Sequence, residues 1–135
     1  MDAGHMARYL ESRASCPVYG NTQTKYYALG DDCFPDMLEA LEQADREGRR
    51  IAAICAAPGV VLGRHGLLKG RTATCFPGFE KEFQDGCYTH QGVVTDGNLT
   101  TARGLGFAVD LGLTLVELLL GSEAAEDTRR RIQYT

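Results

Sequence analysis

The feature that most constrains the fold is a short apolar run that ends on a cysteine. The strand predicted from Arg49 to Ile54 is continuously apolar after its first two residues, as are strands of a parallel sheet that is covered on both faces. Cys55 follows directly, and Ala53 and Ala57 supply the small neighbours that a sharp strand-to-helix turn requires. The sequence therefore predicts a strand, a tight turn that carries a thiol, and a helix.

The position of Cys55 allows two interpretations. A thiol at the start of a helix meets unpaired backbone N–H groups and the positive end of the helix dipole, which favour the thiolate and hence a nucleophile. A cysteine after a buried strand is also commonly an inert core residue. The pattern Ala-Ile-Cys-Ala-Ala by itself favours the inert interpretation. The choice therefore depends on the rest of the chain.

Helix and strand signals alternate on both sides of this turn. Before it, acidic residues at Asp31 and Asp32 and a stripe of apolar residues predict a helix that ends at Gly48. After it, the sequence predicts a short helix and then a strand from Arg71 to Cys75. This order is typical of an α/β fold with a mainly parallel sheet.

The C-terminal part of the chain is expected to form a hairpin and an apolar helix. Strands at Val93–Thr95 and Asn98–Ala102 are joined by the turn pair Asp96-Gly97, a strong hairpin signal. The apolar stretch Phe107–Leu120 is shorter than the roughly 20 residues of a bilayer span, so it predicts a buried core helix and no membrane segment. We expect residues 122–135 to form a charged, frayed tail.

Length and composition narrow the class of protein. A chain of 135 residues suits one domain over residues 1–135, in which residues 1–27 carry no clear pattern. The net charge of −4 gives no reason to expect a nucleic acid or an anionic membrane surface as a partner. The five cysteines are widely spaced and lack a C-x-x-C pair, which predicts reduced thiols in a cytoplasmic protein.

A metal site has little support in the sequence. Cys87-x-x-His90 is the only metal-like spacing, and it lacks a second pair of ligands. A zinc module is therefore the least favoured alternative, and no metal ligand is assigned.

Six short motifs occur in one order between residues 28 and 121. They are Ala44-Asp45-Arg46-Glu47-Gly48, Ala52-Ala53-Ile54-Cys55-Ala56-Ala57-Pro58, Leu67-Leu68-Lys69-Gly70, Ala73-Thr74-Cys75-Phe76-Pro77-Gly78-Phe79-Glu80, Val93-Val94-Thr95-Asp96-Gly97-Asn98 and Thr101-Ala102-Arg103-Gly104. Together they resemble the ThiJ/PfpI family, the Parkinson-disease deglycase relatives, within the class I glutamine amidotransferase-like superfamily. The resemblance implies a flavodoxin-like α/β sandwich and a homodimer, and it favours Cys55 as a nucleophile over an inert thiol.

The resemblance also implies roles for five residues. Cys55 would attack a carbonyl carbon, and the backbone N–H of Ala56 would be an oxyanion donor. Cys75 stands where many relatives carry histidine, and is either a second site residue or a thiol at the end of a buried strand. Arg103 and Gly104 match a segment near the dimer contact, where they would bind substrate or the partner subunit. A structural ion pair is the alternative for Arg103. No cofactor is implied.

The N-terminal part of the family pattern is missing from the resemblance. Relatives carry, before the equivalent of residue 28, a strand that ends in a glutamate hydrogen-bonded to the cysteine, and a Gly-Gly loop. Neither is found here, and Glu11 is not an equivalent. We therefore expect a sheet without its first strands, as in an N-terminally truncated or misannotated reading frame. Uncovered sheet faces and edges would favour oligomerisation or aggregation.

Two functions follow from the resemblance. The first is a cofactor-independent glyoxalase III or protein deglycase, whose substrates are small reactive carbonyls such as methylglyoxal and glycated amines. The alternative is a catalytically impaired, truncated relative that acts as a redox-responsive or chaperone-like module. In that case Cys55 would react with peroxide without turnover.

Overall fold

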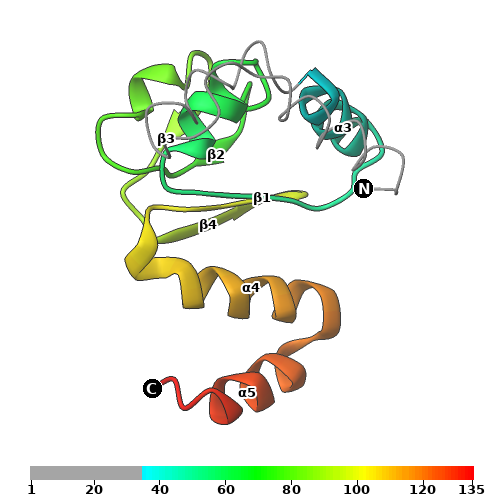
Figure 1. The fold of residues 1–135 in the computed structure, drawn as a ribbon, viewed down its shortest axis with the longest axis vertical. Coiled ribbons are helices and arrows are strands. Elements are labelled where there is room, and N and C mark those ends of the chain that lie inside the picture. Colours follow the sequence, from blue (N-terminus) through cyan, green and yellow to red (C-terminus); the bar gives the residue numbers. More distant parts are fainter. Residues whose placement is uncertain (1–34) are drawn as a thin grey trace, which may run out of the picture. The chain divides into compact units, whose positions relative to one another are not determined.

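The computed structural model describes residues 35–135, which form short helices and strands in alternation (Figure 1). The elements are α3 (Pro35–Arg46), β1 (Ile51–Ile54), the π-helix η1 (Pro58–Gly63), β2 (Thr72–Ala73), the 3-10 helix η2 (Glu80–Glu82), β3 (Cys87–Tyr88), β4 (Val93–Asp96), β5 (Leu99–Ala102), the 3-10 helix η3 (Leu105–Phe107), α4 (Ala108–Leu120) and α5 (Ser122–Arg131). The chain divides into two compact units, residues 1–51 and 52–135, which are described separately below. The expected helix start at Asp31 and the interpretation of Glu11 lie outside the described residues.

Helix α3 lies in the first unit. Its residues Leu38, Leu41 and Ala44 are half-buried, in agreement with the predicted apolar stripe. The helix ends where the sequence predicts, because Gly48 adopts a φ of 68° and the Arg49 N–H turns back to the Ala44 carbonyl at 2.8 Å.

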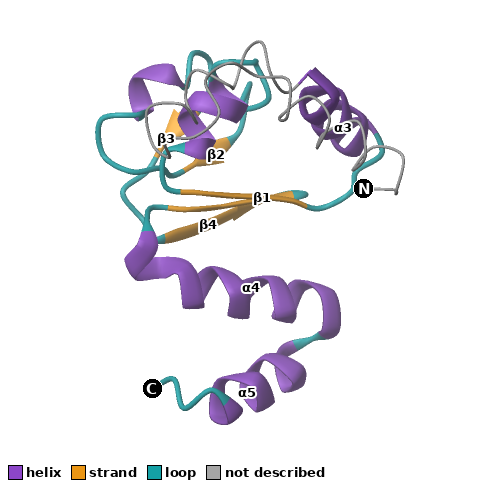
Figure 2. Cartoon of the chain, in the orientation of Figure 1, coloured by secondary structure: helices purple, strands orange, loops and turns teal. Residues whose placement is uncertain are grey.

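The strands form a three-stranded sheet in the order β1-β5-β4 and a parallel pair, β2 and β3. The Cys55 N–H donates to the Ala102 carbonyl at 2.9 Å, so the carboxyl ends of β1 and β5 lie together, as in a parallel pair. Strand β2 covers only Thr72–Ala73 of the strand predicted at Arg71–Cys75. The predicted α/β class with a mainly parallel sheet is confirmed (Figure 2).

The predicted hairpin of β4 and β5 is present, but its turn was placed one residue too early. Asp96 is not a turn residue, because it pairs with Leu99 across the antiparallel ladder. The turn is therefore Gly97-Asn98, with a φ of 60° at Gly97. A tertiary contact keeps Asp96 in the strand, since its carboxylate accepts a hydrogen bond from the Thr72 N–H at 2.8 Å.

Strand β5 is central to the core of the second unit. All four of its residues are buried, and Figure 2 shows α4 on one side of β4 and β5, with β2 and β3 on the other. Hydroxyls on this strand are satisfied inside the core. The Thr101 hydroxyl accepts a hydrogen bond from the Thr74 N–H at 2.9 Å, and the Thr100 and Thr95 hydroxyls lie 3.0 Å apart.

Helix α4 is only partly the buried core helix that the sequence predicts. Leu111 and Leu113 are buried, whereas Val109, Leu119 and Leu120 are 43%, 66% and 74% exposed. The exposed residues leave an apolar face on α4 that no described residue covers. Among the residues that the structure describes, no helix is both long and apolar enough to cross a membrane.

The prediction of a frayed C-terminal tail is wrong. Residues 122–131 form α5, which buries Ala125. Beyond it, the Tyr134 hydroxyl donates to the Asp110 carboxylate of α4 at 2.9 Å, and the Arg129 guanidinium lies 5.2 Å from the centre of the Tyr134 ring. Charge alone suggested a solvated tail because the sequence does not show that Tyr134 reaches back to α4.

Helices η1 and η2 approach closely because η1 presents glycines to η2. A Cβ added at Gly63 would lie 2.5 Å from the Glu82 carbonyl oxygen and 3.1 Å from the Phe83 Cα. Beside this contact, Arg64 donates to the Glu82 carboxylate at 3.3 Å, which lowers the pKa of Glu82. The loop after β2 is thereby held against the helix that follows Cys55.

We expect Gly63→Ala to lower the free energy of unfolding by about 2 kcal/mol, because its methyl group would overlap backbone atoms that cannot move aside cheaply. Gly112→Ala is the matched control. A Cβ at Gly112 of α4 meets nothing within 4 Å, and alanine is the better helix former by up to about 1 kcal/mol. Urea unfolding of both variants checks this prediction, and equal stability would contradict it.

Candidate functional site

Cys55 occupies a tight turn that is hydrogen-bonded on both sides. Its N–H donates to the Ala102 carbonyl at 2.9 Å, and its carbonyl accepts from the Phe76 N–H at 2.7 Å. The φ angle of Cys55 is 65°, in the left-handed region that residues other than glycine rarely adopt. The side chain is half-buried. The predicted strand, turn and helix are therefore present, with a strained thiol-bearing residue at the turn.

Ala56 and Ala57 lie between Cys55 and η1, which begins at Pro58. The Ala56 carbonyl accepts hydrogen bonds from the Gly59 and Val60 N–H groups, both at 3.0 Å. Ala56 is 5% exposed, and within the described part of the chain its N–H has no hydrogen-bond acceptor. An oxyanion donor needs an N–H that no internal acceptor occupies, and among the described residues the Ala56 N–H meets this condition.

The second thiol, Cys75, is fully buried. Burial raises its pKa to about 11, with smaller contributions from the negative charges of Glu80 and Cys55 and an opposing backbone hydrogen bond at Phe79. A thiol with such a pKa stays protonated at neutral pH. This favours the interpretation of Cys75 as a core thiol over a role as base or nucleophile.

Arg103 and Gly104 follow β5, next to the end of β1. The Arg103 Nη1 donates to the His90 carbonyl at 2.7 Å, and the guanidinium lies 4.9 Å from the centre of the Phe107 ring. Among residues 38–135 no carboxylate pairs with it, so the structure shows no ion pair for Arg103 there. Gly104 is buried, and a Cβ there would lie 3.4 Å from the Phe76 ring.

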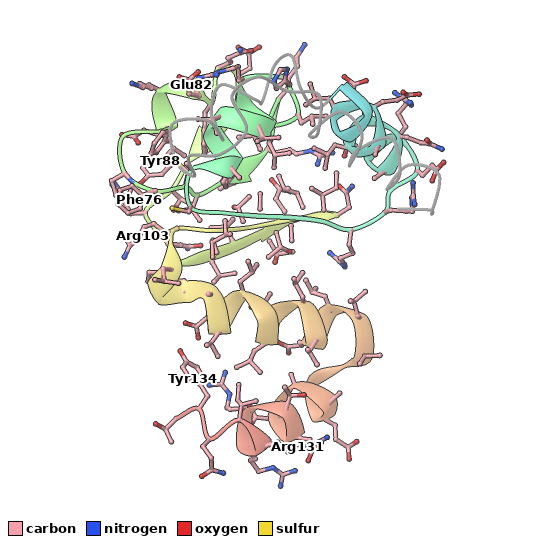
Figure 3. All side chains as sticks on the ribbon, in the orientation of Figure 1. Phe76, Glu82, Tyr88, Arg103, Arg131 and Tyr134 are labelled. Atoms are coloured by element: carbon pink, nitrogen blue, oxygen red, sulfur yellow. The ribbon has the colours of Figure 1, made fainter. Side chains whose placement is uncertain are left out.

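Sequence reasoning missed an aromatic surface beside these residues. Figure 3 shows Phe76, Tyr88 and Arg103 close together on the same side of the second unit. Phe76 is 49% exposed, and the Tyr88 ring lies 4.9 Å from that of His90. Burial, together with the negative charges of Cys75 and Glu80, raises the pKa of Tyr88, while Arg103 opposes the shift. Side chains two positions apart in an extended segment point to the same side, so the spacing Tyr88-x-His90 could have predicted the contact between these two rings.

Metal binding has no support in the described residues. No three side chains of histidine, cysteine, aspartate or glutamate gather there in a way that could hold a metal ion. Cys87 is exposed, and His90 instead contacts Tyr88, whose hydroxyl lies 3.4 Å from the His90 Nδ1. Among the described residues, Cys87 and His90 thus belong to no such group, and the ring contact of His90 is with Tyr88.

Comparison with known proteins gives one consistent family. The sequence model of the DJ-1/PfpI family matches residues 32–118, which is more than half of the chain. The Parkinson disease protein 7 homolog of Danio rerio is 40% identical over 100 residues, which cover 70% of this chain and 51% of that protein.

Solved structures agree with this result. A DJ-1 superfamily protein from Salmonella typhimurium superposes with a TM-score of 0.72 at 38% identity, over 75% of this chain and 55% of that one. Oxidized DJ-1 of Toxoplasma gondii gives a TM-score of 0.74 at 30% identity, over 81% and 58%. These likenesses confirm the predicted flavodoxin-like α/β fold. The chain spans about half the length of these relatives.

The strain at Cys55 predicts a stability difference between two variants that both lack the thiol. Cys55→Gly should unfold with a free energy about 1 kcal/mol higher than Cys55→Ala, because only glycine adopts a φ of 65° without steric cost. Urea titration of the two purified variants measures the difference. An alanine variant as stable as the glycine variant would show that the turn is relaxed.

The raised pKa of Cys75 predicts loss of stability at high pH. Its folded pKa of about 11 lies above the unfolded value of 9.0, so the unfolded chain loses this proton first. The stabilisation that the folded state gains from protonated Cys75 is complete below pH 9.0 and is lost as the pH rises to about 11. Unfolding free energies measured across this window should fall less steeply in Cys75→Ala than in the parent chain. Parallel curves would contradict the assignment.

Proposed function

Since this chain belongs to the DJ-1/PfpI family, we propose that Cys55 performs the thiol chemistry of a glyoxalase III or protein deglycase on small reactive carbonyls. The observation that carries the proposal is the strained turn of Cys55, which holds a half-buried thiol beside the N–H of Ala56. Backbone strain clusters at functional sites, and in α/β-hydrolases the nucleophile lies on a strained strand-to-helix turn of this kind.

The proposed reaction begins with addition of the Cys55 thiolate to the aldehyde carbon of methylglyoxal. The S–C bond forms, the carbonyl electron pair moves to oxygen, and the Ala56 N–H stabilises that oxygen until it takes a proton. A hydrogen shift through an enediol then converts the hemithioacetal into a lactoyl thioester. Water hydrolyses the thioester, which releases lactate and the thiol.

This reaction is balanced without a cofactor. The aldehyde carbon is oxidised and the adjacent ketone carbon is reduced, so methylglyoxal and one water give lactate and a proton. In the deglycase form of the reaction, the same thiolate attacks the carbon that joins a hemiaminal adduct to its amine. The S–C bond forms, the C–N bond breaks, and the amine leaves with a proton, which gives the same hemithioacetal. Cys75 is given no step, because its raised pKa leaves it protonated.

We also propose a homodimer in the cytoplasm. Leu105 is 87% exposed, and Leu119 and Leu120 of α4 are 66% and 74% exposed, which is unusual for large apolar side chains unless a partner covers them. The cytoplasmic location is supported by the odd number of cysteines.

The alternative function is a redox-responsive or chaperone-like module without turnover. The observation that favours it is the same half-buried thiol, which would be open to peroxide whether or not the residues for turnover are present. The solved Toxoplasma gondii relative is an oxidized form of that protein. Mass spectrometry of Cys55 after peroxide treatment, together with the turnover assay below, separates the two functions.

Lactate formation from methylglyoxal tests the enzymatic proposal. We expect the purified chain to form lactate and Cys55→Ser to lose at least about 100-fold in rate, because a serine hydroxyl at neutral pH is a far weaker nucleophile than a thiolate. Cys87→Ser is the matched control, since it removes an exposed thiol and should keep the parental rate within about twofold. Equal rates for the parent and Cys55→Ser would remove Cys55 from the mechanism.

A further inference from the structure

Arg103 is a cation close to the Cys55 turn. Among the described residues, no carboxylate forms an ion pair with it. Arg103 is half-buried, and in the described part of the chain its side chain contacts the His90 carbonyl and the Phe107 ring. One N–H of Nη1 donates to the His90 carbonyl at 2.7 Å. The other N–H groups of the guanidinium have no acceptor among the described residues. A guanidinium in this state is suited to bind a carboxylate through two parallel hydrogen bonds.

The backbone of Arg103 lies next to the Cys55 turn. The Ala102 carbonyl accepts from the Cys55 N–H at 2.9 Å, so Arg103 begins one residue beyond the point where β1 and β5 are joined. The Arg103 N–H donates to the Gly92 carbonyl at 2.9 Å, and stacking on Phe107 restrains the side chain. The cation is therefore held in place before any ligand binds, which lowers the entropy cost of binding.

Aromatic rings border the same place. Phe76 is joined to the Cys55 carbonyl through its N–H at 2.7 Å, and its exposed ring lies against Gly104. Figure 3 shows Phe76, Tyr88 and Arg103 together. Rings of this kind exclude water from one side of a bound anion and strengthen its interaction with the guanidinium.

One carboxylate opposes Arg103 here. Glu80 lies near enough to Tyr88 and Cys75 to raise the pKa of both groups. Its side chain accepts a hydrogen bond from the Gly78 N–H, which partly compensates its charge. Glu80 and Arg103 therefore act in opposite directions on the pKa of Tyr88, and each residue can be changed separately.

We propose that Arg103 makes Cys55 selective for electrophiles that carry a carboxylate on the carbon next to the reacting carbon, of which glyoxylate is the simplest carbonyl example. The proposal rests on the proposed nucleophilic role of Cys55. In the step concerned, the Cys55 sulfur bonds to the aldehyde carbon, the carbonyl electron pair moves to oxygen and takes a proton, and Arg103 holds the carboxylate. The product is a hemithioacetal, and no oxidant or reductant is required.

A pair of alkylating reagents tests this selectivity without any turnover. Iodoacetate and iodoacetamide have nearly the same shape and attack the same thiolate, but only iodoacetate carries a carboxylate. The thiolate fraction of Cys55 affects both rates equally, so the ratio of the two rates does not depend on it. Tryptic cleavage after Arg50 and Arg64 gives a peptide, residues 51–64, whose only cysteine is Cys55, so mass spectrometry reads this thiol alone.

We expect the iodoacetate-to-iodoacetamide ratio at Cys55 to exceed that of N-acetylcysteine amide by about threefold to tenfold, as electrostatic attraction in a partly buried site allows. Arg103→Gln should bring the ratio down to that of the small thiol, and Glu80→Gln should raise it. The matched control is Arg131→Gln, which removes the same charge from an exposed position on α5 and should leave the ratio unchanged. Figure 3 shows Arg131 far from Phe76 and Tyr88.

Two results would overturn the proposal: a parental ratio no higher than that of the small thiol, or an unchanged ratio in Arg103→Gln. The first measurement needs no variant, so it holds even if Arg103→Gln fails to fold. Glyoxylate should also protect Cys55 from iodoacetamide more strongly in the parent than in Arg103→Gln. If methylglyoxal is not turned over while the ratio behaves as expected, the enzymatic function fails and the anion selectivity stands.

Discussion

The hydrogen bonds made by the backbone of Cys55 determine how the second unit is assembled. Its N–H joins the end of β1 to the end of β5, and its carbonyl joins the same turn to the loop after β2 through the Phe76 N–H. Because both bonds come from one residue with a φ of 65°, three segments far apart in the sequence meet at one point. The strain at that residue is offset by contacts that lie elsewhere in the unit.

Close backbone packing maintains this arrangement around the turn. Gly63 lets η1 lie against η2, and the Thr101 hydroxyl accepts from the Thr74 N–H inside the core. Each contact joins the region after β2 to an element next to the Cys55 turn. As a result, the two thiols have different environments although their backbones are close: Cys75 is fully buried, while Cys55 is half-buried. Burial thus separates a thiol that stays protonated from one that solvent can reach.

Charged side chains of opposite sign lie around Tyr88, beside Phe76. Arg103 is held by the His90 carbonyl and the Phe107 ring rather than by a carboxylate among the described residues, so its charge is not neutralised there. Glu80 supplies an opposite charge on the side of Tyr88 and Cys75. The net charge of the chain does not reveal this division of charge around Tyr88.

The sequence by itself determined the local elements whose signals are short-range. These are the strand that ends at Cys55, the helix that stops at Gly48, the hairpin of β4 and β5, and the family to which the chain belongs. Only the tertiary structure decided that Asp96 stays in its strand, because the Thr72 N–H that holds it lies 24 positions away. For the same reason it alone decided that Tyr134 docks the tail on α4, that Cys75 is buried, and that Arg103 lies beside Phe76 and Tyr88. Periodicity and turn chemistry act between neighbours in sequence, whereas burial, electrostatics and the surroundings of the thiol depend on segments that only folding brings together.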